Sequence, residues 1–457
     1  MGNRISTGSR PASVSGLWSG SWSQRGLLFL SLVLSLKLLV HALFVPAFEG
    51  PDEPFHLARV RAFLGGLRLG VEGSSVDADV VATISSLPCC EDLREVFACE
   101  EWGTRPAAFN VLGPLDVHSG CFRPYPNYEA HQPVGYYGLV SAVIALVGTV
   151  IPTVDSEPIS QLLACRVLSL VFVLTGLWVV LPRIRPSGDL SRRSDALLFS
   201  VIALSFPGAA EALIRCANDA AVFLWAAIFL LAFTRQQWPV LAIFSAIGPL
   251  LKLTALPLVL GAVCYLVWKR QWMWTLVVSG STLASLGVQL ARGWSWGGTV
   301  ELNVPLEALG ESVFGIGLGV VKSVLVMSKT ALWLGQWSFF RPPDWVLALF
   351  VVLVGALLTS VDVRRTSRNG VFHVSVALWS IVLIMVFLVQ HRRYFGVWGG
   401  VGGWYLWAWL PWVAMAFTDY RRSAFLPGRW LAIVGTAFSI LTNIAWWVAS
   451  VRLYGLP

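Results

Sequence analysis

Charged residues are scarce in this sequence: they make up 13% of the chain, while hydrophobic residues make up 56%. A soluble domain carries about 25% charged residues, so these proportions exclude an ordinary soluble globular protein. The sequence also lacks an internal repeat of the kind that inverted-topology transporters show, because its two halves differ in loop length and in the placement of charges. That absence argues against a transporter.

Long apolar runs dominate what is present. A helix needs about 20 apolar residues to cross the about 30 Å of hydrocarbon in a bilayer, and runs close to that length recur along the chain. Because lipid offers no hydrogen bonds to the backbone, these runs have to be helical. We therefore expect an all-α polytopic membrane protein. The first run, residues 26–48, is too long for the apolar core of a secretory signal and lacks a small-residue cleavage site, so we expect a retained span. The formal net charge of +8 comes from arginines in short loops, which implies no nucleic-acid partner.

The basic loops predict the orientation of the chain. The basic loops are 183–195, 234–238, 268–272, 362–370 and 419–430. Because positively charged loops stay on the cytoplasmic side, we expect all five in the cytoplasm. About eleven crossings satisfy these assignments: 26–48, 161–182, 195–212, 218–234, 237–251, 253–268, 272–291, 343–361, 371–390, 404–419 and 430–451. The chain then divides into a cytoplasmic tail (1–25), a transmembrane module (26–291) with a large external loop (49–160), a second external loop (292–342) and C-terminal transmembrane helices (343–457).

Two apolar stretches do not cross in this topology. The stretch 133–152 has to lie along the outer leaflet or dip into it, because a crossing there would place four arginines of the next loop outside. Whether it crosses is left open. The stretch 315–335 carries Lys322 and Lys329 and is typical of an interfacial helix. Such external juxtamembrane helices are part of the expected fold.

The seven cysteines fall into two groups. Those in the first external loop could pair in an oxidising compartment, with a connectivity that the sequence does not give: Cys89, Cys90, Cys99 and Cys121. The others lie in or beside apolar spans, where we expect them to be small buried hydrophobes: Cys165, Cys216 and Cys264.

The string GPDEPFHLARVRAFL holds the first polar cluster. Pro54 favours the first turn of a helix, so we expect a helix to begin at Asp52. The apolar positions that follow predict a helix lying on the outer membrane surface. His56 is four residues after Asp52 and three after Glu53, so a helix would place all three side chains on one side. An alternative is that Asp52 only caps the helix and Glu53 only favours its positive dipole end.

The second cluster, YEAHQPVGYYG, precedes the apolar stretch 133–152. Glu129 and His131 again put a carboxylate and an imidazole at the membrane rim. For Tyr136 and Tyr137 we expect places in the aromatic belt at the membrane interface.

Two further clusters lie later in the same module. Asn218 and Asp219 stand at the external start of a span, where an N-cap is the alternative to a site. Lys252 lies between two short apolar spans. An ionisable residue in apolar sequence is by default a functional hypothesis, although a lysine near a helix end can instead extend its amine to the interface.

The last cluster, QHRRY, places His391, Arg392 and Arg393 outside, against the usual distribution of positive charge. An anionic ligand such as a phosphate would explain external arginines, because guanidinium binds phosphate bidentately. Carboxylates suit a general base or a divalent cation, and these cations suit a phosphate. Together the clusters favour transfer of a group from a phosphate-linked donor to a hydroxyl acceptor.

As a set, these residues carry a family resemblance. A first span, an external Asp-Glu pair in a PDEPxH string and a loop ending in ExHQPxxYY resemble the GT-C superfamily of membrane glycosyltransferases, most closely bacterial families of integral membrane proteins with a PDEPxH start. The similarity covers mainly residues 26–291 and includes Arg166, the Asn218–Asp219 pair and Lys252. Two departures are Val134 after Gln132-Pro133, and Gly403-Trp404-Tyr405 where many relatives have GRY.

The resemblance implies an inverting transfer of a sugar from a polyprenyl-phosphate donor on the external face of the plasma (inner) membrane. The acceptor would be a glycan, a lipid or a protein. By carry-over, Asp52 is the general base, and Glu53 assists it or, with Asp52, holds Mg²⁺ or Mn²⁺. Lys252 or the Arg392–Arg393 pair would meet the donor phosphate. The remaining expected substrate-binding residues are His56, Glu129, His131, Gln132, Asn218, Asp219 and Tyr405.

Two other functions compete with this one. A transporter or flippase of a lipid-linked glycan would use a similar cleft, but it should have essential charges buried midway in its spans. A catalytically inactive assembly partner is the third reading. The sequence names neither the sugar nor the acceptor.

Overall fold

The structure is a computed structural model of the 457-residue chain. It describes residues 16–45, 47–48, 52–66, 76–87, 132–184, 197, 199–291, 317–321, 323–324, 327, 345, 369–395, 402–420 and 437–448. The expected interfacial helix at 315–335, the span at 343–361 and the four cysteines of the first external loop fall mostly or wholly outside these residues.

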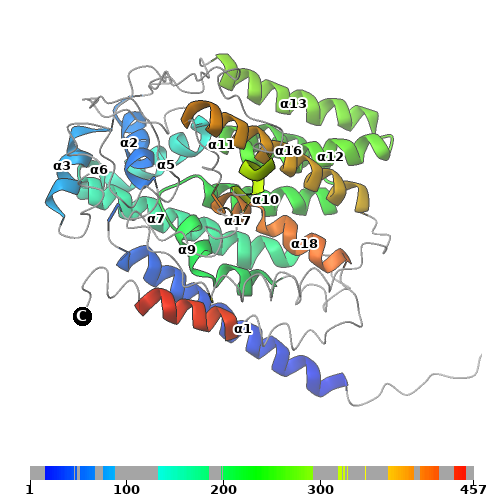
Figure 1. Ribbon diagram of the computed structural model, residues 1–457, viewed down its shortest axis with the longest axis horizontal. Coiled ribbons are helices and arrows are strands. Elements are labelled where there is room, and N and C mark those ends of the chain that lie inside the picture. Colours follow the sequence, from blue (N-terminus) through cyan, green and yellow to red (C-terminus); the bar gives the residue numbers. More distant parts are fainter. Residues whose placement is uncertain are drawn as a thin grey trace, which may run out of the picture.

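The described residues fold into helices, without β-strands among them, as the membrane composition predicts. Figure 1 shows α10 in the middle of the packed helices, with α7 and α9 on one side and α11, α12 and α13 on the other. The elements are α1 (Gly16–Phe44), α2 (Glu53–Leu64), α3 (Ala78–Ser86), α5 (Val134–Gly148), α6 (Pro152–Ser156), α7 (Pro158–Leu174), the π-helical η3 (Thr175–Val180), η4 (Leu181–Arg183), α9 (Pro207–Leu213), α10 (Asp219–Thr234), α11 (Trp238–Leu251), η5 (Leu253–Ala255), α12 (Leu256–Trp268), α13 (Trp272–Ala291), α16 (Gly370–Phe395), α17 (Trp404–Ala408), α18 (Leu410–Tyr420) and a helix at 437–448.

Three helices among the described residues are long and apolar enough to cross a membrane, which indicates that the chain associates with one: Pro158–Arg183, Trp272–Ala291 and Gly370–Gln390. Shorter apolar helices of 10–17 residues occupy several of the other expected spans: Leu28–Phe44, Val134–Gly148, Asp219–Thr234, Trp238–Leu251, Leu253–Trp268 and Ala437–Val448. At 1.5 Å per residue these apolar lengths rise less than the about 30 Å of a bilayer core, although Leu28–Phe44 is the end of the longer helix α1. The count of about eleven crossings therefore stays a prediction.

The helix boundaries mostly follow the expected spans. The span 272–291 coincides with α13, and α10 and α11 lie within one residue of the expected 218–234 and 237–251. The first helix differs, because α1 begins at Gly16, inside the expected cytoplasmic tail, and ends at Phe44.

Two helix hairpins share one kind of turn. The turn TRQQW joins α10 to α11 and the turn WKRQW joins α12 to α13. In each, one residue adopts a positive φ of 56°, Gln236 in the first and Arg270 in the second. The next amide, of Gln237 or Gln271, then donates to a carbonyl five residues earlier at 2.9 Å. This left-handed closure reverses the chain sharply and brings the helices of each pair side by side.

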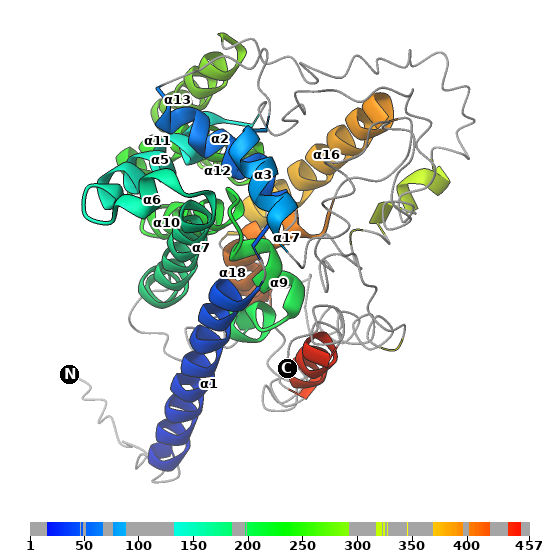
Figure 2. The same ribbon diagram turned by 90° about the vertical axis from the view of Figure 1, so that its left-hand side faces the viewer.

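Small residues allow the hairpins to pack closely. A Cβ at Gly261 of α12 would lie 2.3 Å from Val376 of α16, and one at Gly248 of α11 would lie 2.4 Å from the Trp225 ring of α10. Helices in lipid associate through such close approaches rather than through hydrophobic burial. The helix α16 packs along α12, and Figure 2 shows one end of α16 projecting beyond the packed helices.

The helix α2 is buried rather than lying on a surface. Every residue from Glu53 to Val60 is buried, because α5 and α7 pack against it. Tyr136 and Tyr137 of α5 are 0% exposed, so the aromatic-belt interpretation is wrong for both. The Tyr137 hydroxyl lies 2.7 Å from His56 Nδ1, a contact that joins α5 to α2. Burial of these rings between helices explains why they are absent from the interface.

An ion cluster at the end of α2 fixes its direction. Arg61 Nε donates to Asp77 Oδ2 at 2.8 Å, and its other nitrogens reach Asp79 and Gln161. Burial raises the pKa of Asp77, but the hydrogen bond and charge of Arg61 and the amide of Asp79 lower it more, so the net pKa is below its usual value. The contribution of this contact to stability is therefore present at neutral pH and is lost only as the pH falls through that lowered pKa.

The orientation can be tested with two exposed positions. In intact cells we expect Ala82→Cys, on the predicted external helix α3, to react with an impermeant thiol reagent. Gln271→Cys, in the predicted cytoplasmic turn before α13, should react only after permeabilisation. Labelling is measured above the parent chain, whose own cysteines set the background. The reverse pattern would invert the topology.

Candidate active site

Asp52 occupies the N-cap position of α2 without capping it. The helix begins at Glu53 with Pro54 in its first turn, as expected, but the Asp52 backbone is left-handed (φ 63°, ψ 5°) and its side chain makes no capping hydrogen bond. Its carbonyl oxygen instead accepts from the amides of Phe55 and His56 at 3.1 and 3.0 Å. The capping interpretation is therefore wrong for this side chain.

Glu53 is fully buried and makes an ion pair with Arg166 of α7. Arg166 donates from Nε to Oε1 at 2.8 Å and from Nη2 to Oε2 at 2.6 Å, and Nη1 reaches the Val45 carbonyl at 2.6 Å. The Cys216 amide also donates to Glu53 Oε1 at 3.0 Å. One carboxylate thus ties together α2, α7, the segment after α1 and the segment before α10.

Four further charged side chains alternate in sign. We call Asp52, Arg215, Asp219 and Lys252 the charge chain. Arg215 Nη1 lies 3.9 Å from Asp52 Oδ2, and Arg215 Nη2 lies 3.1 Å from Asp219 Oδ2. Lys252 Nζ lies 2.7 Å from Asp219 Oδ1. The side chains of Arg215, Asp219 and Lys252 are 3%, 0% and 6% exposed, whereas that of Asp52 is 23% exposed. Asp52 is the accessible end of the charge chain.

Lys252 follows α11 in extended backbone, which ends that helix and directs the amine inward. Its ammonium lies 4.8 Å from the centre of the Tyr405 ring, a cation–π contact. The interpretation in which Lys252 extends to the interface is therefore wrong. The expectation that its charge needs an external anion also loses its basis, because Asp219 supplies that anion.

Asn218 and Gln132 meet beside the charge chain. Asn218 stands at the N-cap position of α10 but makes no capping hydrogen bond. Its amide donates to Gln132 Oε1 and to the Leu251 carbonyl, both at 3.2 Å. The N-cap interpretation is therefore wrong for Asn218. These contacts hold the start of α5 and the end of α11 against α10.

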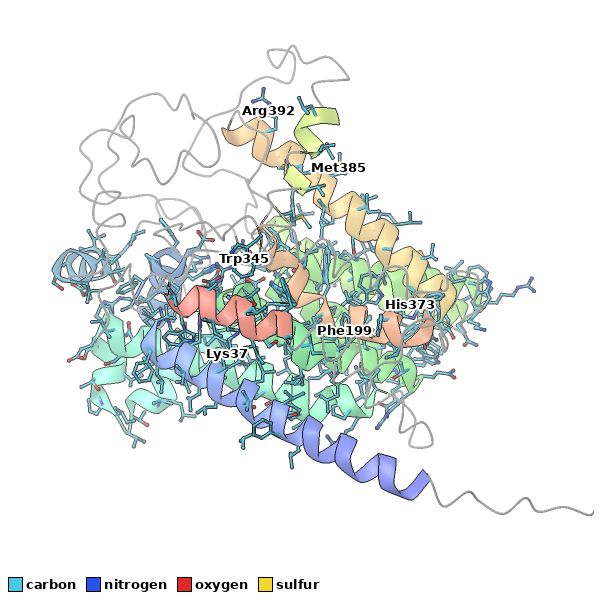
Figure 3. All side chains as sticks on the ribbon, turned by 60° about the horizontal axis from the view of Figure 1, so that its bottom comes forward. Lys37, Phe199, Trp345, His373, Met385 and Arg392 are labelled. Atoms are coloured by element: carbon cyan, nitrogen blue, oxygen red, sulfur yellow. The ribbon has the colours of Figure 1, made fainter. Side chains whose placement is uncertain are left out.

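Most of the other expected site residues cannot be compared with this cluster. Glu129 and His131 lie outside the described residues, as do the side chains of His391 and Arg393. Figure 3 shows Arg392 at the end of α16 that extends away from the packed helices. Their suggested contacts with substrate stay predictions.

Sequence reasoning missed Arg215, which links the two carboxylates of the charge chain. A signal was present in IRCAND, because Arg215 and Asp219 are four residues apart. In the structure the non-helical turn between α9 and α10 brings the two side chains to 3.1 Å. The sequence analysis identified Arg166 only as part of the family motif, and it did not predict that Arg166 pairs with Glu53. Two cysteines flank this region, Cys165 and Cys216, and both are free and buried, as expected. The third cysteine expected to be buried, Cys264, is only partly buried.

The donor set does not fit a divalent cation at Asp52 and Glu53. Both Glu53 oxygens already accept from Arg166, and the Arg215 guanidinium faces Asp52. Positive charges in these places repel a metal ion. The described residues also contain no group of three or more His, Cys, Asp or Glu side chains arranged to hold one. We therefore derive no step through Mg²⁺ or Mn²⁺.

The sequence matches no family model and no curated protein, and the fold matches no solved structure. The resemblance to membrane glycosyltransferases therefore rests on its motifs.

Breaking the buried pair should cost more than breaking a surface pair. Glu53→Gln keeps the size of the side chain but leaves Arg166 buried without a counter-charge, which costs about 3–5 kcal/mol. Asp79→Asn, at a side chain 71% exposed, is the matched control and should cost less than about 1 kcal/mol. The measurement is thermal unfolding of the purified full chain in lipid. Equal losses in both variants would show that the Glu53 pair is dispensable.

Proposed function

We propose that this protein transfers a sugar from a polyprenyl-phosphate donor to a hydroxyl acceptor on the external face of the plasma (inner) membrane. The observation that carries the proposal is the position of Asp52: an accessible carboxylate at the end of an otherwise buried charge chain. A general base has to reach the proton that it accepts, so exposure combined with a fixed backbone favours Asp52 over its buried neighbours.

The surroundings of Asp52 suit proton transfer. Its side chain does not cap α2, and Arg215 supplies a positive charge 3.9 Å away. A left-handed backbone is costly for most residues, although aspartate tolerates it better than most, and such conformations gather at active sites. The backbone of Asp52 is held by its carbonyl contacts with α2, which fixes the point from which its side chain extends.

In the proposed reaction an Asp52 oxygen accepts the proton of the acceptor hydroxyl. The hydroxyl oxygen bonds to the anomeric carbon of the sugar as the bond from that carbon to the donor phosphate oxygen breaks. The polyprenyl phosphate leaves with the electron pair, and one displacement inverts the anomeric centre. Glu53 acts through its pair with Arg166, by fixing the start of α2.

Two cations of the charge chain could bind the donor phosphate. Arg215 faces Asp52, and Asp219 pairs with both Arg215 and Lys252. A donor phosphate would share these cations with Asp219. Arg392 and Arg393 remain proposed contacts for the same phosphate.

A second function is favoured by one observation. Glu211 is buried and Lys37 is half-buried within apolar helices, which is the feature expected of a transporter or flippase of a lipid-linked glycan. Flipping would be measured in vesicles as protection of a fluorescent lipid-linked sugar from an external quencher. Movement of the intact lipid-linked sugar without transfer would favour this function.

Asp52→Asn tests the proposed base. Asparagine tolerates the left-handed backbone about as well as aspartate, so the fold should be kept while the proton acceptor is lost. We expect transfer of radiolabelled sugar from the prenyl-phosphate donor into envelope material to fall by about 10²-fold or more. The measurement uses membranes that contain the full chain.

Donor binding and folding serve as controls for that experiment. Both should be unchanged in Asp52→Asn, and Asp79→Asn should transfer sugar at the parental rate. Transfer at the parental rate by Asp52→Asn would remove Asp52 as the base and direct the search to Glu129.

A further inference from the structure

The turn between α12 and α13 carries two adjacent cations at the boundary of a membrane-spanning segment. It consists of Lys269, Arg270 and Gln271, and α13 begins directly after it at Trp272. The helix α13 is one of the three described helices that are long and apolar enough to cross a membrane. Figure 1 shows the end of α12 and the start of α13 on the side of the packed helices opposite to α2 and α3. The proposed sugar transfer uses none of these residues.

The backbone amides of this turn are already used. The amides of Lys269, Arg270 and Gln271 each donate to a carbonyl in the last turn of α12 at 2.9 Å. Successive amides that point outward together can hold an anion, but these three point back into α12. An anion at this turn therefore has to be bound by side chains.

The side chains of Lys269 and Arg270 are exposed. Lys269 Nζ lies 4.1 Å from the centre of the Trp268 ring and 5.7 Å from that of the Tyr265 ring, so two aromatic faces hold the ammonium in place. Within the part of the chain that the structure describes, no carboxylate makes an ion pair with Lys269 or Arg270. The two positive charges can therefore bind an anion from outside the chain.

The surface next to these cations is apolar. Trp268 is 52% exposed and Trp272 is 59% exposed, and Met273 and Leu276 extend the exposed apolar surface along α13. Tryptophan side chains gather where the hydrocarbon of a bilayer meets the headgroups. Two cations directly beyond exposed tryptophans thus lie at the depth of the lipid phosphates. The ligand that fits both parts is an anion with an apolar tail.

The turn between α10 and α11 shows that closing the chain does not require these features. It has the same left-handed closure, with Gln236 in the place of Arg270. Arg235 is its one charged residue, and its tryptophan, Trp238, is half-buried and contacts the ring of Phe233. The second cation and the exposed tryptophans of the α12–α13 turn are therefore additions to a turn that forms without them.

We propose that Lys269 and Arg270, together with Trp268 and Trp272, bind the headgroup of an anionic phospholipid. The Arg270 guanidinium donates two hydrogen bonds to the lipid phosphate, and the Lys269 ammonium adds a second positive charge beside it. The lipid tails lie along the exposed apolar surface of α13. Binding is non-covalent and holds the start of α13 at a fixed depth in the leaflet, which is the cytoplasmic leaflet in the predicted orientation.

The test measures which lipid lies next to the turn. The full chain carrying Gln271→Cys is labelled with a fluorophore and placed in phosphatidylcholine vesicles that contain a small fraction of a lipid with brominated, quenching tails. We expect brominated phosphatidylglycerol to occupy the place beside the label about fivefold more often than brominated phosphatidylcholine, the ratio that corresponds to the about 1 kcal/mol contributed by one basic residue. The parent chain, labelled in the same way, gives the background from its own cysteines.

Replacing both cations, by Lys269→Gln with Arg270→Gln, should make the two brominated lipids quench equally. Arg235→Gln, at the place in the α10–α11 turn that matches Lys269, is the matched control and should keep the excess quenching by phosphatidylglycerol. An excess that survives the loss of both cations would overturn the proposal, as would equal quenching by the two lipids in the labelled chain with both cations in place.

Two further outcomes would also contradict the proposed lipid site. Loss of the excess in Arg235→Gln would assign it to the overall positive charge of this end of the molecule. Loss of the excess in inorganic phosphate, but not in chloride of the same ionic strength, would show that the turn takes a free phosphate. The readout involves no sugar, so a negative result for Asp52 leaves this proposal intact.

Discussion

The ion pair between Glu53 and Arg166 is the contact on which the rest of the site depends. It joins side chains 113 residues apart in the sequence and is completed by the Cys216 amide and the Val45 carbonyl. In a buried setting such a pair is weak evidence for added stability, because desolvation offsets much of the attraction. Its effect here is geometric: it fixes the start of α2 against α7 and thereby places Asp52 opposite Arg215.

Charge balance explains why the site can exist among apolar helices. Three carboxylates (Asp52, Glu53 and Asp219) face three cations (Arg166, Arg215 and Lys252), so the cluster carries no net charge when all six are ionised. Each buried member has a partner of opposite sign, which is what a low-dielectric environment requires. The balance also bears on phosphate binding, because Arg215 and Lys252 already pair with Asp219 and a donor phosphate would have to share them. Asp52 is the most exposed of the four side chains in the charge chain.

Local sequence spacing predicted the parts of the site that local geometry controls. The start of α2 follows from Pro54, and the places of Asp219 at the start of α10 and of Lys252 after α11 follow from the ends of the apolar spans. The pairing of each cation with its carboxylate did not follow, because it depends on how α2, α7 and α10 pack. The burial of Tyr136 and Tyr137 was missed for the same reason: an apolar stretch with tyrosines reads equally as an interface helix and as an enclosed one.

Mass analysis of cells that lack this chain tests the proposed sugar transfer from a prenyl-phosphate donor. We expect a prenyl-phosphate sugar to accumulate and one sugar to be missing from a cell-envelope glycan, lipid or protein. Both changes should be reversed by the full chain. Unchanged envelope glycans together with an unchanged pool of prenyl-phosphate sugars would contradict the account.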